Sequence, residues 1–387
     1  MTSLSERLSG PSGTTIFEVM SGLARDLGAV NLGQGFPDMD EPEELIAAAR
    51  RALGAHSNQY PPMRGLPELR GAIAGYYGRE QGLSIDPAEI VVTSGATEAL
   101  AASLLALVRP GDEVILVQPL YDAYLPLVQW AGGTARFVSL KPPHWTLPLD
   151  ELAAAIGPGT RGIVLNTPNN PTGTMLTRAE LEAVGALAEA HDLWVVCDEV
   201  WEGMVFDDTH HVSPLSIPAL TQRTVKIGSA GKIFSMTGWK IGWAIAAPAL
   251  ASAIAGKHQF LTFTTATPLQ WAVAEALALP PDWHAAHRAR YAQAKARLVG
   301  GLTRAGFAVL PASGTWFVTV DLAASGLPTD DAVLAERLIR EAGVASIPVS
   351  AFYAAAAETG FLRLCFAKRD ATLDLAVERL ARSRLTG

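Results

Sequence analysis

The sequence predicts an α/β fold: a large, mixed but mostly parallel sheet covered by helices on both faces, with a smaller α+β unit attached. Short apolar, β-branched runs occupy residues 90–94, 113–117, 136–140, 162–166, 193–199 and 224–229. Ala/Leu/Glu stretches of helical character, such as 99–108 and 179–191, lie between them. Strands that alternate with helices are typical of parallel sheets, and near-continuous apolar strands indicate that both sheet faces are buried.

The pattern changes near residue 285, which predicts a boundary between two domains. A charged helical stretch at 287–306 is followed by a second helix at 331–343 and an alternating strand at 361–366. We expect residues 40–284 to form the large domain. Residues 1–39 and 285–387 are expected to form the small domain, because the first 40 residues are too few to fold alone.

Composition excludes several classes of protein. The net charge of -8 over 387 residues, without a basic run, argues against a nucleic-acid partner. Cys197 and Cys365 both lie in apolar runs, which favours a reducing compartment over a disulfide framework. We expect no signal peptide, no membrane span and no metal site, and therefore a cytoplasmic protein.

Lys232 lies in GSAGKIFSMTGWKIGW (residues 228–243), directly after a predicted strand and three small residues. A lysine that forms an imine must lose its proton easily, and burial beside positive charge lowers a lysine pKa. The small neighbours would let a bulky cofactor approach, and Lys240 could neutralise a phosphate. A lone lysine is usually a solvated surface charge, but this apolar, glycine-rich setting favours a reactive amine.

A second segment, VVTSGATEAL (residues 91–100), indicates a strand that runs into a helix around Gly95, Ala96 and Thr97. The free N–H groups and the dipole of a helix N-terminus form an anion site. Because Ser and Thr also cap ordinary helices, this segment alone does not distinguish a phosphate site from a cap.

Asp198 ends the apolar run LWVVCDE. A buried carboxylate needs a partner, and ligands of α/β sheets bind beyond the carboxyl ends of the strands. A pyridinium nitrogen would be a suitable partner. Taken alone, the segment favours the alternative, a helix cap or a salt bridge at the edge of the core.

Asn170 and Arg363 are two further candidates. NTPNNPTG (residues 166–173) predicts a rigid loop that could direct Asn170 into a site, although an ordinary turn explains the segment better by itself. In FLRLCF, alternation places Arg363 on one face of an apolar strand with Phe361 and Cys365. Its guanidinium suits a bidentate carboxylate, and an ion pair within the protein is the alternative.

Taken together, these segments resemble the class I aminotransferases of fold type I, in the branch of kynurenine aminotransferase, glutamine transaminase K and bacterial methionine aminotransferase. The resemblance runs from about residue 17 to the end of the chain. Its most specific blocks are NLGQGFPD (31–38), NTPNNPTG, GSAGK-x-F-x-x-TGWK-x-GW and IPVSAFY (347–353). Four such blocks in this order are very unlikely to arise by chance.

The resemblance implies that pyridoxal 5'-phosphate forms a Schiff base with Lys232, which would also move the proton at the substrate Cα. Asp198 would pair with the pyridine nitrogen, and Asn170 would bond the phenolic oxygen and help to hold the substrate carboxylate. Arg363 would grip that carboxylate near the backbone of Gly35. The further cofactor-binding residues implied are Gly95, Ala96, Ser229 and Lys240 at the phosphate, Thr97, and Tyr121 stacked on the ring.

The resemblance also implies a homodimer with shared active sites. Tyr60 would reach the phosphate of the other subunit, and Phe263 and Thr264 would cross towards its substrate. The implied reaction is ping-pong transfer of an amino group from an L-amino acid to a 2-oxo acid.

One residue departs from the family pattern. The family usually has a tyrosine three residues after the strand-ending aspartate, and its hydroxyl bonds the phenolic oxygen of the cofactor. Here the order is Asp198-Glu199-Val200-Trp201. An indole N–H can donate but cannot accept, so we expect Trp201 to change the titration of the cofactor-bound lysine.

The substrate side chain is constrained by what the sequence offers. No second arginine is evident for a distal carboxylate, and the candidate pocket residues Phe17, Tyr60, Phe263 and Trp316 are all aromatic. This favours donors with apolar, thioether, aromatic or amide side chains over aspartate. Core packing is the alternative for each aromatic residue, and for Trp316 the two interpretations weigh equally.

Three rival functions stay open. The same chemistry would serve a cysteine-S-conjugate β-lyase, because the carbanion expels a β leaving group. An N-succinyldiaminopimelate aminotransferase is the second rival. The third is a ligand-binding regulator that reuses this fold, but such proteins carry an N-terminal DNA-binding domain for which we expect no room before residue 31.

Overall fold

The computed structural model describes residues 15–207 and 209–383 and confirms the predicted fold class. Its large sheet has seven strands in the order β2-β8-β7-β6-β5-β3-β4. Strand β8 runs antiparallel to β2 and β7, and the other neighbouring strands in this sheet run parallel. The bounds are β2 Ile90–Ser94, β3 Glu113–Gln118, β4 Thr134–Ser139, β5 Thr160–Asn166, β6 Trp194–Asp198, β7 Thr224–Ser229 and β8 Ile241–Ile245.

Helices cover both faces of this sheet, because successive strand residues point to opposite sides. Val114 and Leu116 of β3 share a hydrophobic cluster with α5, whereas Ile115 and Val117 pack in a second cluster with α8. The helices of this part are α3 Glu43–Ala55, α4 Pro67–Gln81, α5 Gly95–Leu107, α6 Tyr124–Trp130, α7 Leu149–Ala155, α8 Arg178–Ala190, α9 Pro218–Thr221, α10 Ala230–Ile233, α11 Pro248–Leu261 and α12 Thr267–Leu277.

A second, antiparallel sheet has the order β12-β13-β10-β9 and is built from the C-terminal third of the chain. The N-terminal segment reaches the same region, since β1 (Val30–Asn31) pairs with β11 (Val344–Ala345). The remaining bounds are α2 Ile16–Asp26, α13 Pro281–Arg304, β9 Ala308–Val309, β10 Phe317–Asp321, α14 Asp331–Arg337, β12 Ile347–Pro348, β13 Phe361–Cys365 and α15 Asp370–Arg382.

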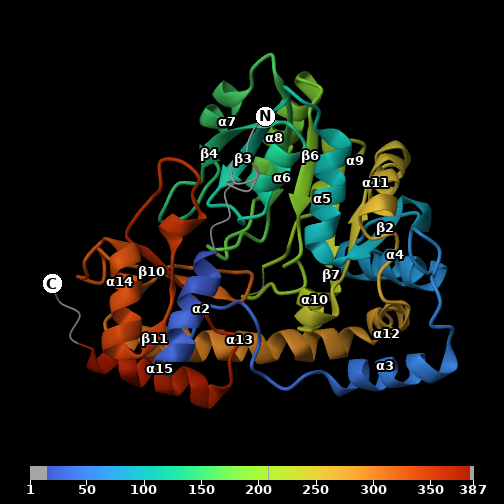
Figure 1. The fold of residues 1–387 in the computed structure, drawn as a ribbon. Coiled ribbons are helices and arrows are strands. Elements are labelled where there is room, and N and C mark those ends of the chain that lie inside the picture. Colours follow the sequence, from blue (N-terminus) through green and yellow to red (C-terminus); the bar gives the residue numbers. More distant parts are fainter. Residues whose placement is uncertain (1–14, 208, 384–387) are drawn as a thin grey trace, which may run out of the picture.

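The long helix α13 runs beneath both sheets, and α14 and α15 lie beside the smaller one (Figure 1). The helix expected at 331–343 becomes a π-helical turn at Leu338–Ala342. Short 3-10 turns occur at Pro87–Glu89, Pro214–Ser216, Thr237–Trp239 and Val349–Phe352. The two-domain division with a boundary near residue 285 stays a prediction.

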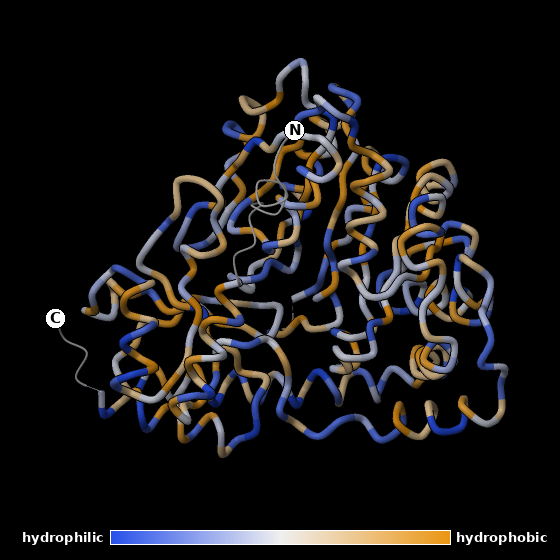
Figure 2. The backbone as a smooth tube through the Cα atoms, viewed as in Figure 1, coloured by the Kyte–Doolittle hydropathy of each residue, from blue (hydrophilic) through white to orange (hydrophobic). Residues whose placement is uncertain are grey.

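Hydrophobic residues are concentrated on the central strands, and the outer loops are mostly hydrophilic (Figure 2). Across residues 15–207 and 209–383, no helix combines the length and the apolar character that crossing a membrane requires.

Candidate active site

A cavity of about 250 Å³ opens where the carboxyl ends of the parallel strands meet. The end of β2 leads to Gly95, the end of β5 is Asn166, the end of β6 is Asp198 and the end of β7 is Ser229. This is the edge at which open α/β sheets bind ligands. The lining residues are Gly95, Ala96, Thr97, Leu100, Tyr121, Asn166, Asn170, Asp198, Val200, Trp201, Ser229, Gly231, Lys232, Thr237 and Lys240.

Lys232 lies in the short helix α10 directly after β7 and projects towards the ring of Trp201, with Nζ 4.7 Å from the ring centroid. Burial is the main cause that lowers the pKa of the Lys232 ammonium to about 8. The positive charges of Lys240 and Arg363 lower this pKa further, whereas the negative charge of Asp198 raises it. A lysine with this pKa supplies a substantial fraction of free amine near neutral pH.

Asp198 ends β6 and lies almost fully buried at the floor of the cavity. Its Oδ2 accepts a hydrogen bond of 2.7 Å from the hydroxyl of Tyr124, and its Oδ1 accepts one of 3.2 Å from the backbone N–H of Val200. Burial raises the pKa of the Asp198 carboxyl to about 6 despite these bonds. A cationic partner in the cavity would favour the ionised carboxylate.

The part of the cavity formed by the start of α5 and Lys240 suits an anion. Helix α5 begins at Gly95. The side chain of Ser94, the residue before it, makes no capping hydrogen bond to the first N–H groups of the helix. Gly95 has a φ of +77°, and a Cβ there would lie 3.1 Å from Lys240 Nζ. Because Gly95 has no side chain, an anion could approach both its backbone and Lys240. This is the arrangement of a phosphate-binding site.

Arg363 reaches the cavity through Asn170. It is fully buried on β13, and its Nη1 donates a hydrogen bond of 2.7 Å to Asn170 Oδ1. Its Nη2 donates a bond of 2.5 Å to the carbonyl of Gly33. Burial lowers the pKa of the Arg363 guanidinium to about 9. Among residues 15–207 and 209–383 no carboxylate pairs with this buried guanidinium, which is therefore suited to an incoming carboxylate.

Aromatic rings surround this guanidinium. Its central carbon lies 3.9 Å from the ring centroid of Phe317, 5.0 Å from that of Phe352 and 5.2 Å from that of Phe17. The carbonyl of Gly33 contacts this guanidinium directly. A Cβ on Gly35 would lie 2.6 Å from the Phe317 ring, so Gly35 lets the N-terminal segment approach Phe317 closely. The expectation that the Gly35 backbone lies near the substrate carboxylate stays a prediction.

Tyr121 lines the cavity wall and packs edge-on against Tyr124 at 5.8 Å. Burial raises the pKa of Tyr121, so the phenol stays neutral. Trp201 also lines the cavity and packs edge-on against Trp316 and Phe317. Trp316 is fully buried and lines no part of the cavity, which supports core packing over a substrate-pocket role.

Tyr60, Phe263 and Thr264 lie outside this cavity, and Phe17, Gly35 and Arg363 are likewise not among its lining residues. Tyr60 is 82% exposed and packs edge-on against Phe263 at 5.5 Å. Thr264 lies with Tyr60 at a separate surface hollow. The prediction that Tyr60, Phe263 and Thr264 serve the site of a partner subunit is not tested by one chain and stays a prediction.

Comparison with known proteins identifies the family. A family model described as aminotransferase class I and II matches residues 28–380. The chain belongs to this aminotransferase family. It is 42% identical to methionine aminotransferase of Escherichia coli over 95% of both chains, and 35% identical to human kynurenine–oxoglutarate transaminase 1 over 92% of this chain and 93% of that one. The solved structure of N-succinyldiaminopimelate aminotransferase from Mycobacterium tuberculosis superposes with a TM-score of 0.93 at 42% identity, covering 98% of this chain and 99% of that one.

The structure of this aminotransferase adds site residues that the sequence alone did not indicate. Tyr124 is the hydrogen-bond donor to Asp198. Asn166 donates to the carbonyl of Asp198 at 2.8 Å, and its Oδ1 accepts from the N–H of Asn170 at 2.8 Å. Tyr124, Asn166 and Gly33 all lie within motifs that were singled out for a neighbouring residue.

Proposed function

We propose that this aminotransferase binds pyridoxal 5'-phosphate in the cavity, with Lys232 as the residue that holds it as a Schiff base. The observation that carries the proposal is the arrangement of three groups along one cavity. A lysine with a lowered pKa and a buried carboxylate line this cavity together with Lys240 and the first residues of α5, which the Ser94 side chain does not cap. These groups fit the amine-reactive carbonyl, the pyridine nitrogen and the phosphate of that cofactor.

When bound, the cofactor supplies an electron sink for the electrons released at the substrate Cα. Lys232 then takes and returns the Cα proton, for which a pKa of about 8 is well matched. Asp198, oriented by Tyr124 and Asn166, holds a proton on the pyridine nitrogen. Ser229, Gly95, Ala96 and Lys240 would hold the phosphate, Thr97 would also contact the cofactor, and Tyr121 would pack on the ring.

Arg363 and Asn170 bind the α-carboxylate of the amino acid. Their mutual hydrogen bond of 2.7 Å orients both before the substrate arrives. The aromatic rings of Phe17, Phe317 and Phe352 exclude water around the guanidinium and strengthen its attraction for a carboxylate. The residues that line the cavity include no arginine for a second carboxylate.

The proposed donors are therefore L-amino acids with apolar, thioether, aromatic or amide side chains, and the acceptors are 2-oxo acids, in a ping-pong reaction. Similarity to the methionine and kynurenine enzymes supports this range of donors. The working form is proposed to be a cytoplasmic homodimer. The exposed Tyr60 and Phe263, with Thr264, would then complete the site of the partner subunit.

A donor panel tests the proposal. The protein loaded with pyridoxal phosphate is mixed separately with L-methionine, L-glutamine, L-kynurenine, L-phenylalanine and L-aspartate, without any oxo acid. We expect the yellow colour to bleach with the first four donors faster than with aspartate. Bleaching that is fastest with aspartate would overturn the proposed donor class, and a protein that takes up no cofactor would overturn the site.

A second candidate, favoured by the similarity to the Mycobacterium tuberculosis enzyme, is an aminotransferase acting on N-succinyldiaminopimelate. Adding that compound to the panel decides between the two, because it would then bleach the yellow colour faster than every simple amino acid. The β-lyase alternative is checked in the same experiment with a cysteine conjugate, which would yield pyruvate and a thiol.

A further inference from the structure

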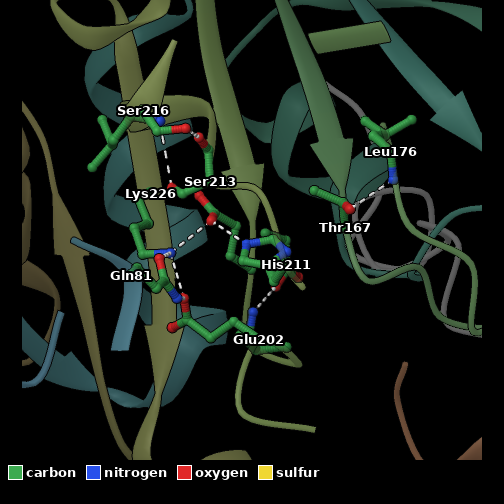
Figure 3. A network of polar contacts seen from close by, with 12 residues as sticks. Gln81, Thr167, Leu176, Glu202, His211, Ser213, Ser216 and Lys226 are labelled. Atoms are coloured by element: carbon green, nitrogen blue, oxygen red, sulfur yellow. Dashed lines mark hydrogen bonds and ion pairs between the residues drawn. The ribbon is translucent and has the colours of Figure 1, made fainter. Parts of the chain in front are cut away.

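A buried ionic cluster lies beside the proposed cofactor site, on the other side of the segment that follows β6. Lys226 of β7 is fully buried, and its Nζ bonds Glu199 Oε2 at 2.6 Å and also bonds Glu202 Oε2. His211 Nε2 lies 2.6 Å from Glu199 Oε2, and Gln81 Nε2 donates to Glu202 Oε2 at 2.6 Å. Figure 3 shows Gln81, Glu202, His211 and Lys226 gathered around these contacts.

The ammonium occupies the place that a metal ion would otherwise suit. The ligand atoms of Glu199, Glu202 and His211 lie within 4.8 Å of one another. Burial opposes the charge of Lys226, but the two carboxylates outweigh it and raise the pKa of the ammonium. Burial likewise opposes the charge of Glu199, but Lys226 and His211 lower the pKa of this carboxyl. The cluster is thus an internal ion pair that stays charged, and its cation is a side chain.

Two aromatic residues, Tyr77 and Trp243, extend the hydrogen-bond network of the cluster. The hydroxyl of Tyr77 donates to Glu202 Oε1 at 2.5 Å and accepts from Trp243 Nε1 at 2.8 Å. Gly228 lies directly against them, because a Cβ there would come within 2.0 Å of Trp243 Nε1. The network is therefore packed tightly against β7 just before Ser229.

One turn joins the cluster to the cofactor cavity. Its backbone bonds run from the N–H of Glu202 to the carbonyl of Glu199 (2.9 Å) and from the N–H of Met204 to the carbonyl of Trp201 (2.8 Å). Asp198 and Trp201, three residues apart, line the cavity. Glu199 and Glu202, also three residues apart, bond Lys226. The two pairs of side chains thus serve two different sites from a single turn.

The far end of the turn contacts the residue that follows the reactive lysine. A Cβ on Gly203 would lie 3.2 Å from Ile233 Cγ1 and 3.4 Å from Ile233 Cα. A shift of the turn would therefore move Trp201 and press on α10, which carries Lys232.

We propose that Lys226, by clamping Glu199 and Glu202, is a positioning residue that sets where Asp198, Trp201 and Lys232 stand in the cavity. This inference rests on the proposed function of that cavity. Lys226 touches neither substrate nor cofactor and acts through the turn. Because a misplacement of about 1 Å can cost on the order of 10²-fold in rate, a small displacement of the turn would be visible in turnover.

Lys226→Met removes the clamp, and Lys226→Met with Glu202→Gln removes it while keeping the net charge of the cluster. The matched control is Lys141→Met, which removes the exposed pair with Glu151. Amide hydrogen exchange is measured first on the cofactor-free chains. We expect exchange in residues 199–206 to rise by about tenfold in both Lys226 variants and to stay unchanged in the control.

The second readout is the Kd for pyridoxal phosphate and the kcat with L-methionine, measured well below each Tm. If Lys226 is a positioning residue, the charge-balanced double variant should have a higher Tm than Lys226→Met. Its kcat should nevertheless stay at least about tenfold below that of the wild type. A double variant with normal exchange, normal Kd and normal kcat would overturn the proposal. Gly203→Ala, which displaces the same turn without changing charge, should reproduce the faster exchange if Lys226→Met does not fold.

The two proposals fail in distinguishable ways. A wild-type protein that binds no pyridoxal phosphate would end the proposed function, whereas the exchange experiment needs no cofactor. Unchanged exchange of residues 199–206 in every folded variant, with normal turnover by the wild type, would end only the inference about Lys226.

Discussion

Lys226 and Lys232 lie six residues apart and face opposite electrostatic surroundings. Lys226 bonds two buried carboxylates directly, and these raise its pKa despite burial. Lys232 packs against indole rings and has cationic neighbours, and burial lowers its pKa to about 8. Burial alone therefore does not decide the charge of a lysine. The carboxylates within bonding distance decide it here, so strand β7 carries a structural lysine and the helix that follows it, α10, carries a reactive one.

The largest effect is expected from Lys232→Ala. Loss of the proton-transferring amine should lower turnover by on the order of 10²–10⁴-fold or more. Cofactor should still bind through Asp198, Lys240 and the N-terminus of α5. The check is kcat with L-methionine together with cofactor uptake followed by absorption, and near-normal turnover would remove Lys232 from the mechanism.

Asp198→Asn tests the acid that faces Lys232. Without the negative charge the pyridine nitrogen loses its proton, so kcat should fall by on the order of 10²–10³-fold. The control is Tyr124→Phe, which removes one hydrogen bond to Asp198 and should cost far less. Equal losses in the two variants would show that orientation, not charge, is what Asp198 contributes.

Arg363→Lys tests how the substrate carboxylate is bound. A lysine keeps the charge but loses the bidentate fork, so we expect KM for the amino acid to rise by about thirtyfold, equivalent to about 2 kcal/mol. Steady-state kinetics with several donors checks this. An unchanged KM for every donor would place the carboxylate elsewhere.

The pKa values predict different reactivity of the two lysines in the cofactor-free protein. Since only the free amine is acylated, modification of Lys232 should reach half its maximal rate near pH 8 and fall as the pH drops. Lys226, whose pKa is raised, should stay unmodified over the same range. Mass spectrometry of acylated peptides separates the two sites, and equal labelling of both would contradict the comparison.

The smallest effect is expected from Trp201→Tyr. A phenol can both donate and accept a hydrogen bond, whereas an indole N–H can only donate, so the pH at which the visible absorption of the loaded protein changes should shift by about one unit or less. Identical titration curves would remove Trp201 from the electrostatics of the site.

The strands and most site residues could be predicted from the sequence because apolar runs end in polar residues at one sheet edge. The run at 224–229 coincides with β7, and Asp198 ends β6 as expected. Strand β8 was not predicted, because Ile241–Ile245 follows the lysine motif directly and owes its antiparallel pairing to contacts with β2 and β7.

The partners of the site residues could not be predicted, because they depend on contacts between distant segments. Arg363 meets Asn170 and Gly33 across 193 and 330 residues. Lys226 sits in an apolar run that indicated only a strand, and its partners Gln81 and Glu202 lie in other segments. Local sequence patterns predict which strand, helix or loop carries a side chain, whereas the packing of distant segments decides which groups that side chain contacts.

The central claim is that Lys232, and not Lys226, carries the cofactor. Borohydride reduction of the protein loaded with pyridoxal phosphate, followed by peptide mass spectrometry, tests this directly. We predict a single pyridoxyl group on the peptide that contains Lys232, and none after prior treatment with L-methionine. A label on Lys226 or another lysine, or no label on the wild type, would contradict the account.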